Sequence, residues 1–92
     1  MITEKEIKKL QETIVIAFDE ALRKEGKKKI FLAFEELRKL LTELLGDKPG
    51  NNSLTKAIDR LEGKKVLDHD TINRRTVYYL TELTKCYLDA KS

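Results

Sequence analysis

Four polar side chains within one short stretch carry hydrogen-bonding groups that suit nucleic-acid bases and phosphates. They are Asn52, Thr55, Lys56 and Arg60. An Asn amide can bond adenine through two hydrogen bonds, and Arg or Lys favours guanine or a phosphate oxygen. The same residues would also suit a helix face that is merely solvated. Their types and spacing alone leave both interpretations open.

A helix would place these side chains on one surface. Four apolar residues recur with helical spacing and form one stripe, namely Leu54, Ala57, Ile58 and Leu61. At about 100° per residue, Asn52, Lys56 and Asp59 lie opposite that stripe, with Thr55 and Arg60 at its flanks. We expect the helix to begin among residues 51–53, whose short side chains can cap it, and to end at Gly63.

A charged β-hairpin is predicted directly after this helix. Residues 65–69 and 75–80 are rich in Val, Leu and Tyr, as strands are, and residues 70–74 form the turn between them. Four basic residues flank or occupy it: Lys64, Lys65, Arg74 and Arg75. Adjacent arginines near a turn can reach a minor groove or the phosphate backbone. Between Asn51 and Tyr79 there are six basic and four acidic residues, so the local positive excess is small.

The preceding segments provide further elements. Thr3 and Glu6 fit a capping box for a first helix that extends to about Glu25, where Gly26 is a left-handed stop. Residues 30–34 suit a short strand, and residues 35–45 suit a second helix that Gly46 caps. The run of lysines at 27–29 is either a solvated loop or a phosphate contact.

The ends of the chain suggest association with a second copy. Val15 and Ile16 lie off the main apolar stripe of the first helix, which favours a partner surface. Thr81 can cap a last helix over residues 82–90. Cys86 on that helix is either a small buried hydrophobe, a bystander or an intersubunit disulfide partner.

This order of elements resembles the winged helix-turn-helix DNA-binding domains, in particular the small MarR-like and PadR-like regulators. The closest likeness is SLTKAIDRLEGKKVLDHDTINRRTVYYLTELT, which ends in an aromatic-x-Leu-Thr pattern formed by Tyr78, Leu80 and Thr81. Small winged-helix proteins of archaeal viruses are similar in size and layout. The resemblance implies one α+β, mainly α domain over residues 1–92, with the order helix, strand, helix, helix, hairpin wing and helix.

The resemblance also implies binding of double-stranded DNA by a homodimer that forms through helices 3–25 and 82–90, as in a transcriptional regulator. The candidate DNA-contacting residues are Asn51, Asn52, Ser53, Thr55, Lys56, Arg60, Lys64, Lys65, Asn73, Arg74 and Arg75. The alternative is a winged-helix adaptor that binds protein and does not bind DNA.

Composition limits other functions. The chain has a net charge of +3 and 38% charged residues, and no apolar run is long enough to span a bilayer, so we expect a cytoplasmic protein that does not enter a membrane. With one cysteine and one histidine, His69, the sequence offers no metal-ligand spacing. It also lacks a nucleophile-base pair or a phosphate-binding loop. We therefore expect neither an enzyme nor a cofactor.

Overall fold

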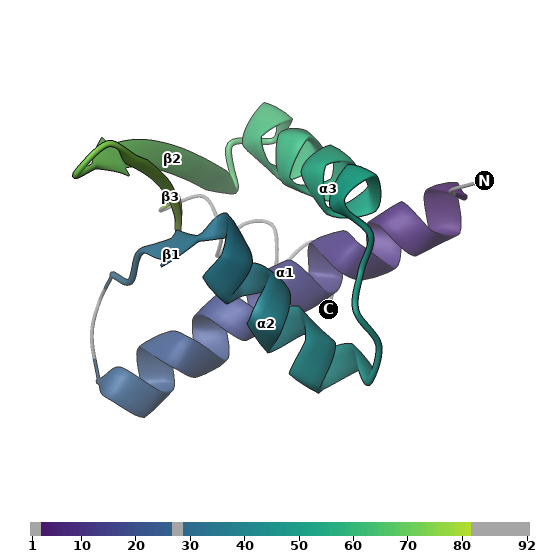
Figure 1. Ribbon diagram of the computed structural model, residues 1–92, viewed down its shortest axis with the longest axis horizontal. Coiled ribbons are helices and arrows are strands. Elements are labelled where there is room, and N and C mark those ends of the chain that lie inside the picture. The colour runs from purple at the N-terminus through teal and green to yellow at the C-terminus, as the bar shows by residue number, and fades with distance from the viewer. Residues whose placement is uncertain (1–2, 27–28, 82–92) are drawn as a thin grey trace.

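The computed structural model describes residues 3–26 and 29–81, which form three helices and a three-stranded antiparallel sheet (Figure 1). Their order is α1 (Glu4–Glu25), β1 (Leu32–Ala33), α2 (Phe34–Leu45), α3 (Asn51–Gly63), β2 (Leu67–Ile72) and β3 (Arg75–Leu80). The predicted α+β, mainly α fold class is confirmed, and the arrangement is consistent with a winged-helix fold. The helix predicted at residues 82–90 lies outside the described residues.

Helix α1 begins and ends as the sequence predicts. The Thr3 hydroxyl accepts a hydrogen bond from the Glu6 backbone N–H at 3.2 Å, which satisfies one of the unpaired donors of the first turn. Gly26 ends the helix in the left-handed conformation, with φ of 63°, where a residue without a Cβ is least strained.

The expected partner surface on α1 does not include Val15. Its side chain is 1% exposed and belongs to the core, whereas its neighbour Ile16 is 47% exposed. Helix α1 contacts α2, α3 and β3, so its buried arc is wider than one stripe. Only Ile16 of the two remains on the surface.

The first strand is shorter than predicted because the following helix begins early. Only Leu32 and Ala33 form β1, and Phe34 already belongs to α2. The Glu36 carboxylate accepts a hydrogen bond from the Ala33 N–H at 3.3 Å, which favours this early start. At the other end of α2, Gly46 adopts the predicted left-handed cap with φ of 74°.

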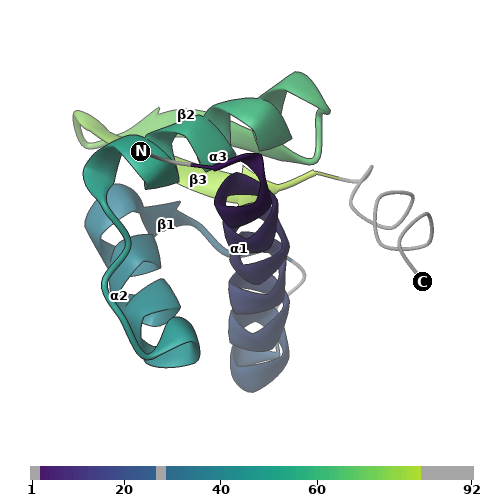
Figure 2. The same ribbon diagram turned by 90° about the vertical axis from the view of Figure 1, so that its right-hand side faces the viewer.

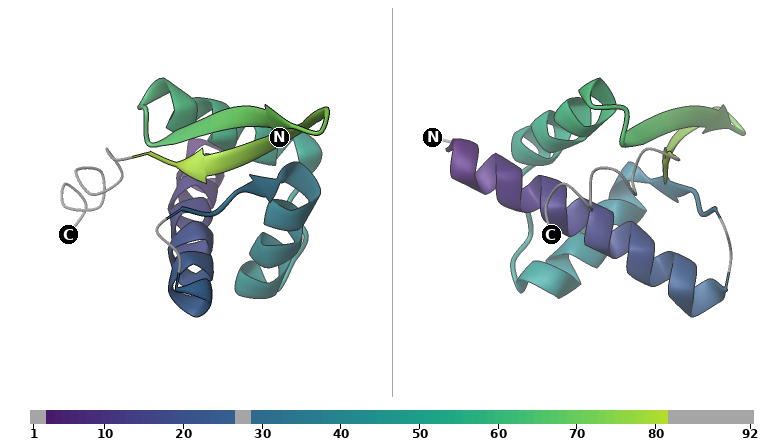
Figure 3. Two further views of the ribbon diagram at one scale, coloured as in Figure 1. Left: turned by 90° about the vertical axis from the view of Figure 1, so that its left-hand side faces the viewer. Right: turned by 180° about the vertical axis from the view of Figure 1, so that it is seen from behind.

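The sheet has the strand order β1-β3-β2, so β3 is the central strand and β2 forms one edge (Figure 3). The pair Ile72 and Arg75 closes the hairpin, and only Asn73 and Arg74 lie between them. The predicted five-residue turn at 70–74 is therefore wrong, because β2 runs three residues further than expected. Positive φ at both Asn73 and Arg74 matches a tight primed turn, whose twist suits paired strands.

The outer edge of β2 is occupied by its own side chains. The Asp68 carboxylate accepts from the His69 N–H at 2.8 Å, and the Asp70 carboxylate accepts from the Thr71 N–H, also at 2.8 Å. An edge strand normally leaves such N–H groups open to solvent or to another strand. Here two of them are bonded within the strand.

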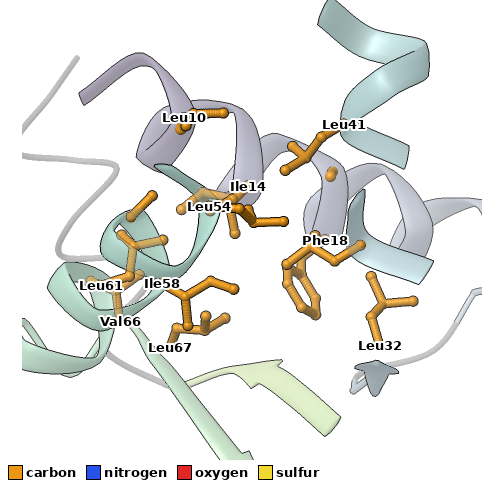
Figure 4. Packing of buried hydrophobic residues seen from close by; sticks show 14 of the residues in the cluster. Leu10, Ile14, Phe18, Leu32, Leu41, Leu54, Ile58, Leu61, Val66 and Leu67 are labelled. Carbon is orange, nitrogen blue, oxygen red and sulfur yellow. The ribbon is translucent and has the colours of Figure 1, made fainter. Parts of the chain in front are cut away.

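One apolar core joins the helices to the base of the hairpin (Figure 4). Its largest fully buried side chains are Phe18, Ile14, Leu37, Leu41, Leu54, Leu61, Leu67, Val15 and Val66. The predicted stripe of α3 is buried along its whole length. Among the described residues, no helix has the length and apolar character that a membrane crossing requires.

Candidate nucleic-acid interface

The first turn of α3 is capped by backbone alone. Gly50 is the N-cap, with no capping hydrogen bond from a side chain, and its carbonyl accepts the Leu54 N–H at 3.0 Å. The helix begins at Asn51 as predicted, but the expected capping by the short side chains of residues 51–53 is not found. Asn51 and Asn52 are exposed to solvent.

The outward face of α3, defined by Asn52, Thr55, Lys56 and Asp59, is exposed as predicted. The opposite side of the helix is held by fully buried residues such as Leu54 and Leu61, so this face is fixed against the core. Among the described residues, Lys56 forms no ion pair, and Ser53 at the edge is half-buried.

Arg60 lies at the flank of α3 and is bound within the molecule. Its guanidinium donates two hydrogen bonds to the Glu4 carboxylate at the start of α1, one of them with Nη2 and Oε1 2.6 Å apart. These hydrogen bonds lower the pKa of Glu4 and raise that of Arg60. Both side chains are well exposed, at 40% for Arg60 and 69% for Glu4. No local pattern predicts this pair, because 56 residues separate its members.

The two lysines after α3 lie at the base of the hairpin. The Lys64 ammonium lies 3.5 Å from the side-chain oxygen of the buried Gln11 in α1. Lys65 is exposed and adopts a left-handed conformation with φ of 61°. Thr81 packs against this connection, since its hydroxyl donates to the Val66 carbonyl at 3.1 Å.

The hairpin tip, residues 72–75, presents two arginines. Arg74 and Arg75 are exposed, and neither forms an ion pair within the part of the chain that the structure describes. Asn73 beside them is also exposed. Residues 66–71 separate the tip from Lys65, a distance of roughly 20 Å at strand spacing. The four basic residues of the hairpin therefore form two separate groups.

The start of α3 and the hairpin tip face the same side of the molecule. Both lie toward the left in Figure 2, while Figure 1 shows them well apart along its horizontal axis. The structure thus divides the candidate residues into two groups. The group on α3 consists of uncharged polar side chains and Lys56, and the group at the hairpin tip contains Arg74 and Arg75. Arg60, Lys64 and Lys65 join neither group.

A second contact that the sequence did not predict ties the end of α3 to β2. The His69 ring nitrogen Nδ1 lies 2.9 Å from a Glu62 carboxylate oxygen, and the ring meets Tyr78 edge-on with centroids 6.3 Å apart. The hydrogen bond with Glu62 raises the pKa of His69, and the charges of Glu62, Asp68 and Asp70 act in the same direction. His69 is therefore part of a contact between helix and hairpin.

The two tyrosines of β3 face opposite sides of the sheet, as predicted. Tyr78 packs against the core, whereas the Tyr79 ring lies on the outer side, 5.4 Å from Phe31 between centroids. The Lys29 ammonium lies 4.0 Å from the centre of the Tyr79 ring, and the Tyr79 hydroxyl donates to Asp68 at 3.2 Å. This aromatic cluster is thus partnered by side chains of its own chain.

Comparisons with protein families and with curated proteins identify no relative of this chain. Protein-family models match no part of this chain, and no curated protein has significant similarity to it. Among the described residues, no three His, Cys, Asp or Glu side chains are grouped so that they could hold a metal ion.

Proposed function

We propose that this protein is a winged helix-turn-helix DNA-binding protein that acts as a dimeric transcriptional regulator. The observation that carries the proposal is the outward face of α3. Its Asn52, Thr55 and Lys56 side chains are exposed on a helix whose other side is fully buried. A rigid helix with free donors and acceptors is what reading of base edges in a major groove requires.

In the proposed complex, α3 enters the major groove. A helix with its side chains is about 10–12 Å across, and the major groove of B-DNA is about 12 Å wide. Asn52 would bond adenine, Lys56 would bond guanine or a phosphate, and Thr55 would contact either. The hairpin tip faces the same side, so Arg74 and Arg75 would contact the flanking backbone or minor groove.

The charges give a quantitative expectation for salt. Three exposed cations, Lys56 on α3 and Arg74 and Arg75 at the hairpin tip, form no ion pair with described residues. If each neutralises one phosphate, the slope of log K against log salt is about −3 for each protomer. Asp59 on the same face opposes phosphate, which favours discrimination between bases over strong nonspecific affinity.

The dimer is part of the same proposal. Ile16 is a large apolar side chain exposed on α1, one of the two helices expected to form the dimer. Two copies of α3 about 34 Å apart would enter successive major grooves on one side of the duplex. Sedimentation equilibrium of the protein alone tests this part, and a monomer at all concentrations would remove the dimer from the proposal.

Titration of a fluorescent random-sequence duplex at several salt concentrations tests DNA binding. We expect the Arg74→Ala, Arg75→Ala double variant to bind more weakly and to reduce the slope by about 2 for each protomer. Lys9→Ala with Lys24→Ala is the matched control, because it removes two exposed lysines from α1. Equal losses in both double variants would remove the tip from the interface.

The adaptor alternative predicts a different result. A protein that binds only other proteins would show no anisotropy change with the duplex at 50 mM salt and would not be retained on heparin. The capped edge of β2 speaks against an adaptor that adds a strand there, because the His69 and Thr71 N–H groups are already bonded.

A further inference from the structure

The contact between Glu4 and Arg60 lies at the end of a row of side chains on α3. Asn52, Lys56 and Arg60 are spaced four residues apart, so they follow one another along the helix surface. Glu4 bonds both terminal nitrogens of Arg60, and the charge of Lys56 also lowers the pKa of Glu4, after the larger effects of Arg60 and Lys8. One carboxylate thus pairs with Arg60 at the end of this row and also interacts electrostatically with Lys56.

We propose that Glu4 sets the affinity of this protein for DNA by competing with the phosphate backbone for Arg60. The inference rests on the proposed DNA binding, which it deepens by assigning a role to a residue of α1, outside α3. In the free protein Glu4 holds Arg60, and in the complex a phosphate or a guanine edge replaces the carboxylate. The net number of phosphates that α3 neutralises then depends on how completely Glu4 is displaced.

The chemistry of the two acceptors makes the exchange feasible. Glu4 occupies the paired N–H groups through which arginine binds phosphate or guanine. Glu4 and DNA therefore cannot both accept hydrogen bonds from these two groups at the same time. The pair is largely exposed, and such surface pairs contribute little to stability. Displacing Glu4 therefore costs little folding stability, while its charge remains close to the bound DNA and opposes binding.

A Glu4→Gln variant tests the proposal, with Glu6→Gln as its matched control. Both residues lie in the first turn of α1 and are exposed, and both substitutions remove one negative charge near the same helix end. Glu6, unlike Glu4, has no ion pair among the described residues. The probe is a fluorescent random-sequence 24-base-pair duplex at about 50–200 mM KCl, the range in which counterion release is steep.

We expect Glu4→Gln to bind about five-fold more tightly than Glu6→Gln at 0.1 M salt, with a slope steeper by about 0.9 for each protomer. The gain should disappear in the Glu4→Gln, Arg60→Gln double variant, because Arg60 supplies the new contact. Circular dichroism of each variant shows whether the fold is retained.

The possible results separate the inference from the proposed function. Equal affinity and slope for Glu4→Gln and Glu6→Gln overturn the competition, and weaker binding by Glu4→Gln shows that the pair positions α3 instead. A gain that persists without Arg60 also overturns it. If neither the wild-type protein nor any variant binds the duplex, the proposed function fails, and the inference fails with it.

Discussion

The two halves of α3 differ in where their polar side chains bond. In the first half, Asn51, Asn52 and Lys56 are exposed, and the cap is provided by the backbone of Gly50. In the second half, Arg60 is bonded to α1 and Glu62 to His69 of β2. The first half is exposed to solvent, while the second joins the helix to its neighbours.

This difference shows how one short helix can be held firmly and still present a free polar surface. Burial of the apolar stripe fixes the depth and rotation of α3, because its residues are packed along the whole helix. The contacts with Glu4 and His69 add lateral ties to α1 and to the hairpin. Substitutions in either half of α3 should therefore have different effects.

Loss of the buried support should have the largest effect. Leu54 is fully buried beneath the free half of α3, so Leu54→Ala should lower the free energy of unfolding by about 2–5 kcal/mol through lost burial and a cavity. Thr55→Ala, one residue further and exposed, should change it by less than about 0.5 kcal/mol. Urea unfolding measures both, and similar losses would show that α3 is not packed as described.

Removing an amide from the free half should have an intermediate effect. Under the proposed function, Asn52→Ala should lose discrimination at one base pair, worth about 1–3 kcal/mol for a bidentate contact. Selection from randomised duplexes reveals it as one position that is no longer specified. Glu62→Gln in the bonded half should keep the wild-type preference, and an unchanged preference in Asn52→Ala would exclude Asn52 from base reading.

The smallest effect should come from the tie between α3 and β2. The Glu62 hydrogen bond raises the folded-state pKa of His69 above its ordinary 6.5. The resulting stabilisation is therefore complete below about pH 6.5 and is lost as the pH rises through the folded-state value. The difference in urea midpoint between wild type and His69→Gln should be larger at pH 5.5 than at pH 8.5. An equal difference at both pH values would mean that charge on His69 contributes nothing.

Sequence predicts the parts of this molecule that depend on neighbours along the chain. The stripe of α3, the Thr3 cap and the left-handed Gly26 and Gly46 all follow from residues within one or two helical turns. The exposure of Asn52 and Lys56 follows from the same periodicity, because the face opposite a buried stripe must point to solvent.

Errors and omissions arose where distant segments meet. Val15 is buried because α1 contacts three other elements. The periodicity of one helix does not show how many elements pack against it, so it does not predict how wide the buried arc is. The sequence pattern predicts the start of the hairpin turn too early, since Asn73 and Arg74 are not a strong two-residue turn signal. Periodicity places Arg60 at the flank of α3 but cannot reveal its contact with Glu4, because 56 residues separate the two.

The two aspartates along the outer edge of β2 also bear on how the protein behaves in concentrated solution. Growth of intermolecular sheet starts when a strand edge accepts a new chain, and here that step would break the bonds from the His69 and Thr71 N–H groups and crowd carboxylates together. These bonds oppose the addition of a further strand at the outer edge of β2. The hairpin can thus extend from the core with an unpaired edge whose outward N–H groups at His69 and Thr71 are blocked by its own side chains.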